Sequence, residues 1–307
     1  MSVFALIAAL ILEQVHPLPA QRFVYSPLSR LAALAERNLN AGEAKHGAIA
    51  WALLVGGLGG VGAVAYWTLS AISPVLGWVW SCVVLYATLG FRQFSHYFSD
   101  IQEALRVGEV PKARQLLREW CGVETAGLGS SDISRLAIES GLRASHRHVF
   151  AVVFWFVVLP GPSGAIIYRV SAMLADAWGE RQTGLATFGS FARMAFAVMD
   201  WLPQRLTAMT FAIVGDFEDA IHCWRAHSTR GTEDAMGVVV ASGSGALGVR
   251  LGTPFENVGN DADRAMSPFV GDEADVDYMQ STVGLVWRAL LLWLLLLFLL
   301  SVARWAG

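Results

Sequence analysis

The stretch from Ala289 to Ala303, ALLLWLLLLFLLSVA, contains no charged residue, and Arg288 and Arg304 flank it. With residues 283–287 added, the apolar run reaches about 20 residues, the length that a helix needs to cross the hydrocarbon core of a bilayer. Arg288 lies near one end of the run, where its side chain can extend toward the interface. The stretch therefore predicts a membrane-spanning helix rather than a buried helix of a soluble core.

The composition of the whole chain agrees with a membrane protein. Hydrophobic residues make up 55% of the 307 residues, the mean hydropathy is +0.48 and only 15% of the residues are charged, against about 25% in soluble domains. The net charge of −3 argues against nucleic acid as a partner. The cysteines Cys82, Cys121 and Cys223 lie far apart, which indicates neither a zinc site nor a disulfide framework.

Other apolar segments recur along the chain, and together they predict an all-α, polytopic integral membrane protein with four to five transmembrane helices. The N-terminal segment lacks a basic start, so we interpret it as a short retained helix rather than a signal peptide. Pro160–Pro162 interrupts the fourth segment, which leaves one broken span and a re-entrant hairpin as alternatives. We expect a single domain over residues 1–307, with spans at about 1–12, 48–69, 75–91, 149–177 and 283–303.

The polar segments 13–47, 92–148 and 178–282 separate these spans and are expected to carry amphipathic cytoplasmic helices. Basic residues concentrate in the first two, and the positive-inside rule places those in the cytoplasm of a bacterial inner membrane, with the charge-free turn at 70–74 outside. We favour the cytoplasmic side for the third as well. Its apolar stretch Leu206–Val214 is too short to be a span.

Within the polar segments, local signals predict individual helices. The pattern between Ser29 and Asn40 is typical of a short amphipathic helix on the membrane surface. Residues 99–120 indicate two helices separated at Gly108–Pro111.

Glycine residues are spaced in a recognisable way at two places in the sequence. Gly56 and Gly60 have the small-xxx-small spacing that lets a neighbouring membrane helix approach closely. Gly243, Gly245 and Gly248 match a dinucleotide-binding fingerprint, but a helix cannot continue far beyond them because Gly252 and Pro254 follow. We expect a tight turn at this second pattern.

A basic cluster formed by Arg143, His146, Arg147 and His148 stands at the start of the fourth apolar segment. It suits either a phosphate or, as we favour, membrane anchoring with contacts to lipid headgroups. His146 and His148 are two residues apart and would point roughly 200° apart on a helix, so we expect no shared metal ion.

Acidic residues gather at two places in the last polar segment. Their carboxylates could bind Mg²⁺ through oxygen ligands, although such runs are more often solvated surfaces. The metal ligands are therefore unknown at this point. The first group is Asp216, Glu218 and Asp219, and the second is Asp272, Glu273, Asp275 and Asp277.

Five stretches of the chain resemble the CobD/CbiB family of cobalamin biosynthesis: residues 103–128, 138–156, 161–170, 199–217 and 245–252. The resemblance covers nearly the whole length. It implies an adenosylcobinamide-phosphate synthase, an acid–amine ligase that forms an amide between adenosylcobyric acid and aminopropanol or its phosphate. ATP and Mg²⁺ would be the cofactors of an active enzyme.

The resemblance also implies roles for six residues. Glu124 and Glu139 would be catalytic, and Thr125, Tyr168, Arg169 and Arg205 would bind substrate. The chain departs from the family pattern at several polar positions. Val123 replaces an arginine, Arg143, Ala144, Arg147 and His148 replace Glu, Asn, Asp and Gly, residues 172–175 replace an NTLD-like motif, and Phe196 and Ala197 replace two aspartates.

These departures leave two functional hypotheses. The first is the amide synthase, and the second is a non-catalytic membrane signalling or regulatory protein resembling AmpE, which would need neither ATP nor Mg²⁺. The expected partners are the lipid bilayer, a corrinoid substrate under the first hypothesis, and a second copy of the chain in a homo-oligomer. Nucleic acid is not expected.

Overall fold

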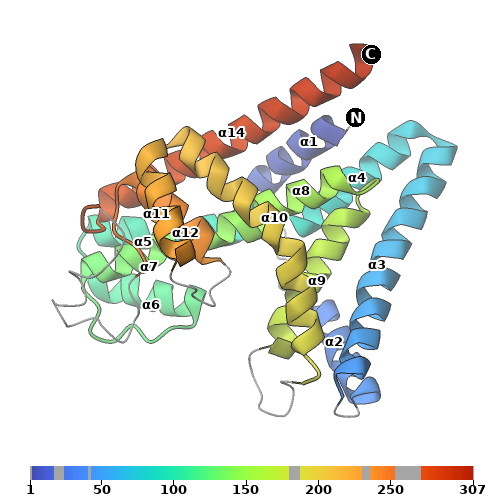
Figure 1. Ribbon diagram of the computed structural model, residues 1–307, viewed down its shortest axis with the longest axis horizontal. Helices are drawn as coiled ribbons and strands as arrows, with labels where there is room; N and C mark the ends of the chain where they lie inside the picture. Colours follow the sequence, from blue (N-terminus) through green and yellow to red (C-terminus); the bar gives the residue numbers. More distant parts are fainter. Residues whose placement is uncertain are drawn as a thin grey trace. The chain divides into compact units, whose positions relative to one another are not determined.

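The computed structural model describes residues 2–16, 24–40, 43–179, 187–229, 236–252 and 271–306 (Figure 1). Within these ranges the regular elements are helical, apart from one isolated bridge between Val249 and Asp272. The all-α prediction is confirmed. The helices are α1 (Ser2–Val15), α2 (Ser26–Leu39), α3 (Ala44–Ile72), α4 (Pro74–Thr88), α5 (Phe91–Arg106), α6 (Val110–Cys121), α7 (Ser130–Ser145), the π-helical turn η2 (His146–Phe150), α8 (Ala151–Val158), α9 (Ser163–Gly179), α10 (Ser190–Val214), α11 (Phe217–Thr229), α12 (Gly237–Leu247) and α14 (Val276–Ala306).

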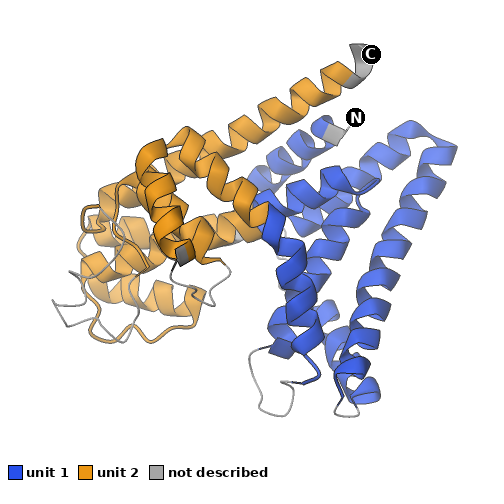
Figure 2. Ribbon diagram, viewed as in Figure 1, with its two compact units in different colours: residues 1–90, 148–202 blue, residues 91–147, 203–307 orange. Residues whose placement is uncertain are grey.

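The contacts within the chain gather in two compact units, each built from two separate segments (Figure 2). Unit 1 comprises residues 1–90 and 148–202, and unit 2 comprises residues 91–147 and 203–307. The second boundary falls inside α10. The expectation of one domain over the whole chain stays a prediction.

Among the described residues, two helices are long and apolar enough to cross a membrane: α3, and α14 over residues 276–303. Both turn large apolar side chains outward, including Leu53 and Val64 on α3 and Leu291 and Leu299 on α14. Apolar side chains on the outside of a helix belong in a hydrocarbon solvent rather than in water. The shorter apolar helices α1 and α4 occupy the positions of two further predicted spans.

The chain turns back at Pro160–Pro162, between α8 and α9. The left-handed backbone at Gly161 (φ 68°) makes the turn, and α9 then packs against α8. Gly164 permits this packing, since a Cβ there would lie 1.9 Å from the carbonyl oxygen of Trp155. The arrangement matches the hairpin of the two expected alternatives.

Helix α10 exposes several large apolar side chains and buries several polar ones. Val198 and Ile213 are 72% and 57% exposed, whereas Asp200, Gln204 and Thr207 are buried. A helix at the surface of a soluble protein has the opposite arrangement, because its polar side chains face water. Where the sequence suggested only the short stretch Leu206–Val214, the structure has a helix of 25 residues that contains Pro203.

The polar segments contain the predicted helices. Helix α2 confirms the amphipathic helix before the second span, and its apolar side packs against α3. Helices α5 and α6 confirm the pair separated near Gly108, whose φ of 78° ends the first of them.

The glycine contacts of α3 differ from the prediction. A Cβ added at Gly56 or Gly60 would meet nothing within 4 Å, whereas at Gly59 and Gly62 it would approach side chains of α9 to 2.5 Å and 2.3 Å. The glycines of α3 do serve helix packing, but the predicted face is wrong. Periodicity alone cannot show which of several neighbouring glycines faces the partner helix.

The expected tight turn at Gly243 and Gly245 is also wrong, because both residues lie inside α12. A Cβ at Gly245 would lie 2.2 Å from the backbone oxygen of Asp219 on α11, so this glycine allows the two helices to touch. Gly248 alone has the left-handed backbone (φ 67°), and it ends the helix. The glycines therefore serve helix packing, and no nucleotide-binding turn forms here.

The difference between Gly59 and Gly60 gives a matched test of the α3–α9 contact. We expect G59A to lower the free energy of unfolding by about 1–3 kcal/mol, because the added methyl overlaps Ile167. G60A should change it by less than about 0.5 kcal/mol. Reversible unfolding in mixed detergent micelles measures both. Equal destabilisation by the two variants would contradict the packing described here.

Candidate functional site

The residues that the resemblance singled out fall into both units. Each unit has its own polar centre, built from side chains of different helices. Unit 2 contains Glu124, Thr125, Glu139 and Arg205, and unit 1 contains Tyr168 and Arg169.

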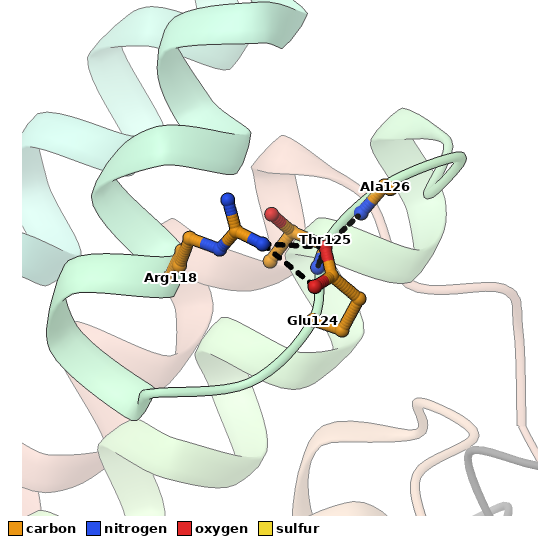
Figure 3. A network of polar contacts seen from close by, with 4 residues as sticks. All are labelled: Arg118, Glu124, Thr125 and Ala126. Carbon is orange, nitrogen blue, oxygen red and sulfur yellow. Dashed lines mark hydrogen bonds and ion pairs between the residues drawn. The ribbon is translucent and has the colours of Figure 1, made fainter.

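Glu124 organises the loop between α6 and α7 (Figure 3). Helix α6 ends at Gly122, whose left-handed backbone (φ 69°) directs the chain into the loop. Both carboxylate oxygens of Glu124 accept hydrogen bonds from Arg118 Nη2, at 2.7 Å and 2.6 Å. Oε1 also accepts from the backbone N–H groups of Thr125 and Ala126. The Glu124 side chain is nevertheless 68% exposed, whereas Thr125 is buried.

These donors make Glu124 a weak base. The hydrogen bond from Arg118, then that from Ala126 and the charge of Arg118, hold the pKa of the Glu124 carboxyl below its ordinary value. A general base works best with a pKa near the operating pH. Glu124 is therefore suited to fixing the loop rather than to accepting a proton.

Glu139 lies on α7 in more enclosed surroundings, with 14% of its side chain exposed. Its Oε1 accepts a hydrogen bond from the backbone N–H of Gly252 at 2.7 Å. Arg135, one turn earlier on α7, lies 3.8 Å from the same oxygen and 3.7 Å from Asp132. The result is a shielded carboxylate held in place by one backbone donor and one guanidinium.

The loop of Glu124 begins beside the helical turn that carries Glu139. Cys121, the last residue of α6, contacts the hydroxyl of Ser140 at a Sγ–Oγ distance of 3.2 Å. Burial raises the pKa of the Cys121 thiol, which opposes the thiolate form that a nucleophile needs. Cys121 therefore links two parts of the site and is not a nucleophile. Arg205 lies half-buried on α10, and its role stays a prediction.

Arg169 is the centre of the polar group in unit 1, where it lies on α9 and is only 7% exposed. Its Nη2 donates to the hydroxyl of Tyr25 and to Nδ1 of His148, the latter at 2.7 Å. The guanidinium carbon also lies 5.3 Å from the centre of the Tyr25 ring. The carboxylates of Asp176 and Glu13 also act on the guanidinium electrostatically.

Tyr168 is fully buried next to Arg169 and donates a hydrogen bond to Asp200 at 2.8 Å. Sequence reasoning missed both Asp200 and Tyr25 as site residues. Asp200 lies in the resembling stretch 199–217 but was assigned no role, and Tyr25 lies in none of the five stretches. Both are polar residues near apolar segments, where polar groups need partners.

The histidines of the basic cluster have separate roles. His146 is buried and its Nδ1 contacts the hydroxyl of Thr207 at 2.9 Å, within unit 2. His148 contacts Arg169 in unit 1. The two histidines thus have different partners, and the prediction that they share no metal ion stays a prediction.

Aspartates of the acidic runs stabilise the first turns of two helices. Asp216 accepts hydrogen bonds from backbone N–H groups at the start of α11, and Asp275 does the same for α14. Glu273 accepts from Ser131, and Asp272 accepts from the hydroxyl of Tyr278. Among the described residues, no group of three or more His, Cys, Asp or Glu side chains is placed to hold a metal ion. The described residues therefore form no ready-made cluster of carboxylates around a metal position.

The contact with Arg118 predicts how Glu124 titrates. We expect R118Q to raise the pKa of Glu124 toward its ordinary value, measured by ¹³C NMR of the side-chain carboxyl. Because the pKa is lowered in the folded protein, the ion pair stabilises the fold above the ordinary pKa of glutamate, and this contribution is lost as the pH falls through the lowered value. An unchanged titration in R118Q would contradict the contact in Figure 3.

Comparison with known proteins identifies the family. The model of the family described as CobD/Cbib protein matches residues 6–286. The cobalamin biosynthesis protein CobD of Stutzerimonas stutzeri is 32% identical over 307 residues, which cover 97% of each chain. CobD of Chromobacterium violaceum is 33% identical over 62% of this chain and 60% of its own. CbiB of Salmonella typhimurium is 26% identical over 82% of this chain and 80% of its own.

No solved structure matches the chain. The named relatives support the cobalamin hypothesis rather than the AmpE-like alternative. Since both the family model and a relative at 32% identity extend over nearly the whole length, the chain belongs to the CobD/CbiB family of cobalamin biosynthesis proteins.

Proposed function

We propose that the chain is a membrane-bound acid–amine ligase of cobalamin biosynthesis, which joins the carboxylate of adenosylcobyric acid to aminopropanol or its phosphate. The observation that carries the proposal is the similarity to the cobalamin biosynthesis protein CobD of Stutzerimonas stutzeri over 97% of both chains. The retained Glu139, Tyr168 and Arg169 support it, since each is buried or nearly so and held by hydrogen bonds.

Amide formation requires an activated carboxyl group and an amine that has lost its proton. ATP and Mg²⁺ would supply the activation in such a ligase. Because the described carboxylates do not gather around a metal position, we assign no step to a metal-bound group. The residues of this chain are assigned only to binding and to proton transfer.

Glu139 is the better of the two predicted carboxylates for taking the proton of the amine. It is shielded from water, lies on a helix rather than a loop, and its Oε1 is oriented by Gly252 N–H. A positioned base on a rigid element is what proton transfer requires. Glu124 is less suited, because it is exposed, lies in a loop and has a lowered pKa.

Arg169 is suited to binding an anionic group of a substrate. Both of its hydrogen bonds to described residues come from Nη2. Within the described part of the chain, Nε and Nη1 therefore have no hydrogen-bond acceptor, and each of them can donate a hydrogen bond to an anionic group of a substrate.

Replacing the two glutamates separates their roles. E139Q keeps an oxygen that accepts from Gly252 N–H but cannot take a proton, so we expect about 10²–10⁴-fold slower amide formation. E124Q should have a much smaller effect, since Glu124 only fixes a loop. The measurement is the rate of cobinamide formation by purified protein in lipid nanodiscs, with cobyric acid, aminopropanol phosphate, ATP and Mg²⁺.

A bacterium that lacks its own CobD or CbiB protein gives the test in cells. The wild-type chain should restore cobinamide formation from cobyric acid, and E139Q should not, at equal amounts of membrane-inserted protein. Failure of the well-expressed wild-type chain would overturn the proposed activity. Loss of activity in E124Q but not in E139Q would overturn the assignment of Glu139.

We further propose a multi-pass topology in the bacterial inner membrane, with α5, α6, α7, α11 and α12 of unit 2 in the cytoplasm and α14 in the bilayer. Supporting this, α7 packs against α5 and α6, which are rich in charged residues, and also against α12 and the start of α14. Segments that fold into one compact unit outside the bilayer share one side of it. Residues 92–147 and the segment after α10 therefore belong on the same side, with the turn at 70–74 opposite.

Cysteine labelling in intact cells tests this topology in a cysteine-free background. We expect A71C to react with a membrane-impermeant maleimide, because the positive-inside rule places its turn outside. E119C on α6 and E218C on α11 are both exposed on unit 2 and should react only after the cells are permeabilised. Labelling of E119C and E218C from opposite sides would contradict the proposed topology.

A further inference from the structure

The contact between His148 and Arg169 determines the protonation state of the histidine. Arginine has five N–H donors and no acceptor. A distance of 2.7 Å between Arg169 Nη2 and His148 Nδ1 is therefore a hydrogen bond only if Nδ1 carries no proton. The structure thus assigns His148 the neutral form, with its single proton on Nε2.

The donors of Arg169 Nη2 are completely used in this arrangement. One N–H points to the hydroxyl of Tyr25 and the other to His148 Nδ1. The Tyr25 ring lies against the guanidinium as well. Two acceptors from outside α9 therefore hold Nη2 in place. Because the guanidinium is planar and rigid, they also determine the directions in which Nε–H and Nη1–H point.

We propose that His148 is a positioning residue for Arg169 that works only when neutral, and that acidification releases the guanidinium. Protonation of Nδ1 removes the acceptor and brings an imidazolium against a guanidinium. The consequence for catalysis rests on the proposed function, in which Arg169 binds a substrate anion.

The other charged groups near the pair do not replace the lost acceptor. Asp176 on α9 and Glu13 on α1 act on Arg169 electrostatically. Their negative charges offset part of the repulsion between two neighbouring cations. They do not, however, occupy the position of Nδ1 at the edge of Nη2, so the guanidinium loses its orientation even where the net charge is balanced. Tyr25 remains as the single acceptor.

The hydrogen bond can be tested without any activity, by ¹⁵N NMR of protein labelled at histidine in lipid nanodiscs. H148N identifies the signals of His148. At neutral pH we expect Nδ1 without a proton and Nε2 with one. In R169M the Nδ1–H form should become populated, because the donor that selects the tautomer is gone. H222Q, which removes an exposed histidine of α11, should leave the signals of His148 unchanged.

The second arm compares two substitutions in the ligase assay. The Asn Oδ1 occupies the place of His Nδ1 and accepts at every pH, whereas leucine accepts at none. We expect H148L to raise KM for the anionic substrate roughly tenfold at neutral pH, the size of one hydrogen bond to a charged group. H148N should rescue most of this loss and should remove the increase in KM that the wild type shows on acidification.

The two arms separate the possible failures. A protonated Nδ1 at neutral pH, or a tautomer that does not respond to R169M, overturns the positioning role of His148. Equal loss of affinity by H148N and the wild type on acidification overturns that role as well. Absence of ligase activity in the wild type overturns the proposed function instead, and the NMR result then decides on His148 alone.

Discussion

The constraint on which the structure depends is that helices with apolar exteriors have to satisfy their polar groups internally. In hydrocarbon, an unpaired charge or hydroxyl has no water to bind. Helix α10 shows the result, since Val198 faces outward while Asp200 on the opposite side accepts from Tyr168. On α9, the buried Arg169 is enclosed by Tyr25 and His148. Burial of polar groups thus brings Tyr25, His148 and Arg169 together in unit 1.

In unit 2, several polar side chains instead organise loops and helix ends. Glu124 shapes the loop after α6, and Asp216 and Asp275 begin helices. Glu139 is the exception, since it is shielded and lies on a helix. The contrast between two carboxylates in the same unit is what distinguishes a candidate base from a structural residue.

The sequence was sufficient to predict the fold class, α3, α14 and the helix pair around Gly108. Their signals are local: the mean hydropathy of a short window, or a single residue that ends a helix. Helix α10 could not be predicted in this way, since its polar face lowers the mean hydropathy although its outer face is apolar. The family resemblance supplied Arg169 and Glu139 but not Tyr25, which is 144 residues from Arg169 in sequence. Such pairs come from tertiary packing, which no local pattern records. The same limit explains why the predicted packing glycines of α3 are the wrong ones.

We expect the outer face of α10 to lie in lipid, while Asp200, Gln204 and Thr207 point inward. Spin labelling at Val198 in lipid vesicles tests it most directly, in a cysteine-free background and with E218C as the water-exposed control. If Val198 faces lipid, the label on V198C collides readily with oxygen, which concentrates in the bilayer, and hardly at all with a water-soluble nickel chelate. A label at Val198 that collides with the nickel chelate as readily as the one on E218C would contradict it.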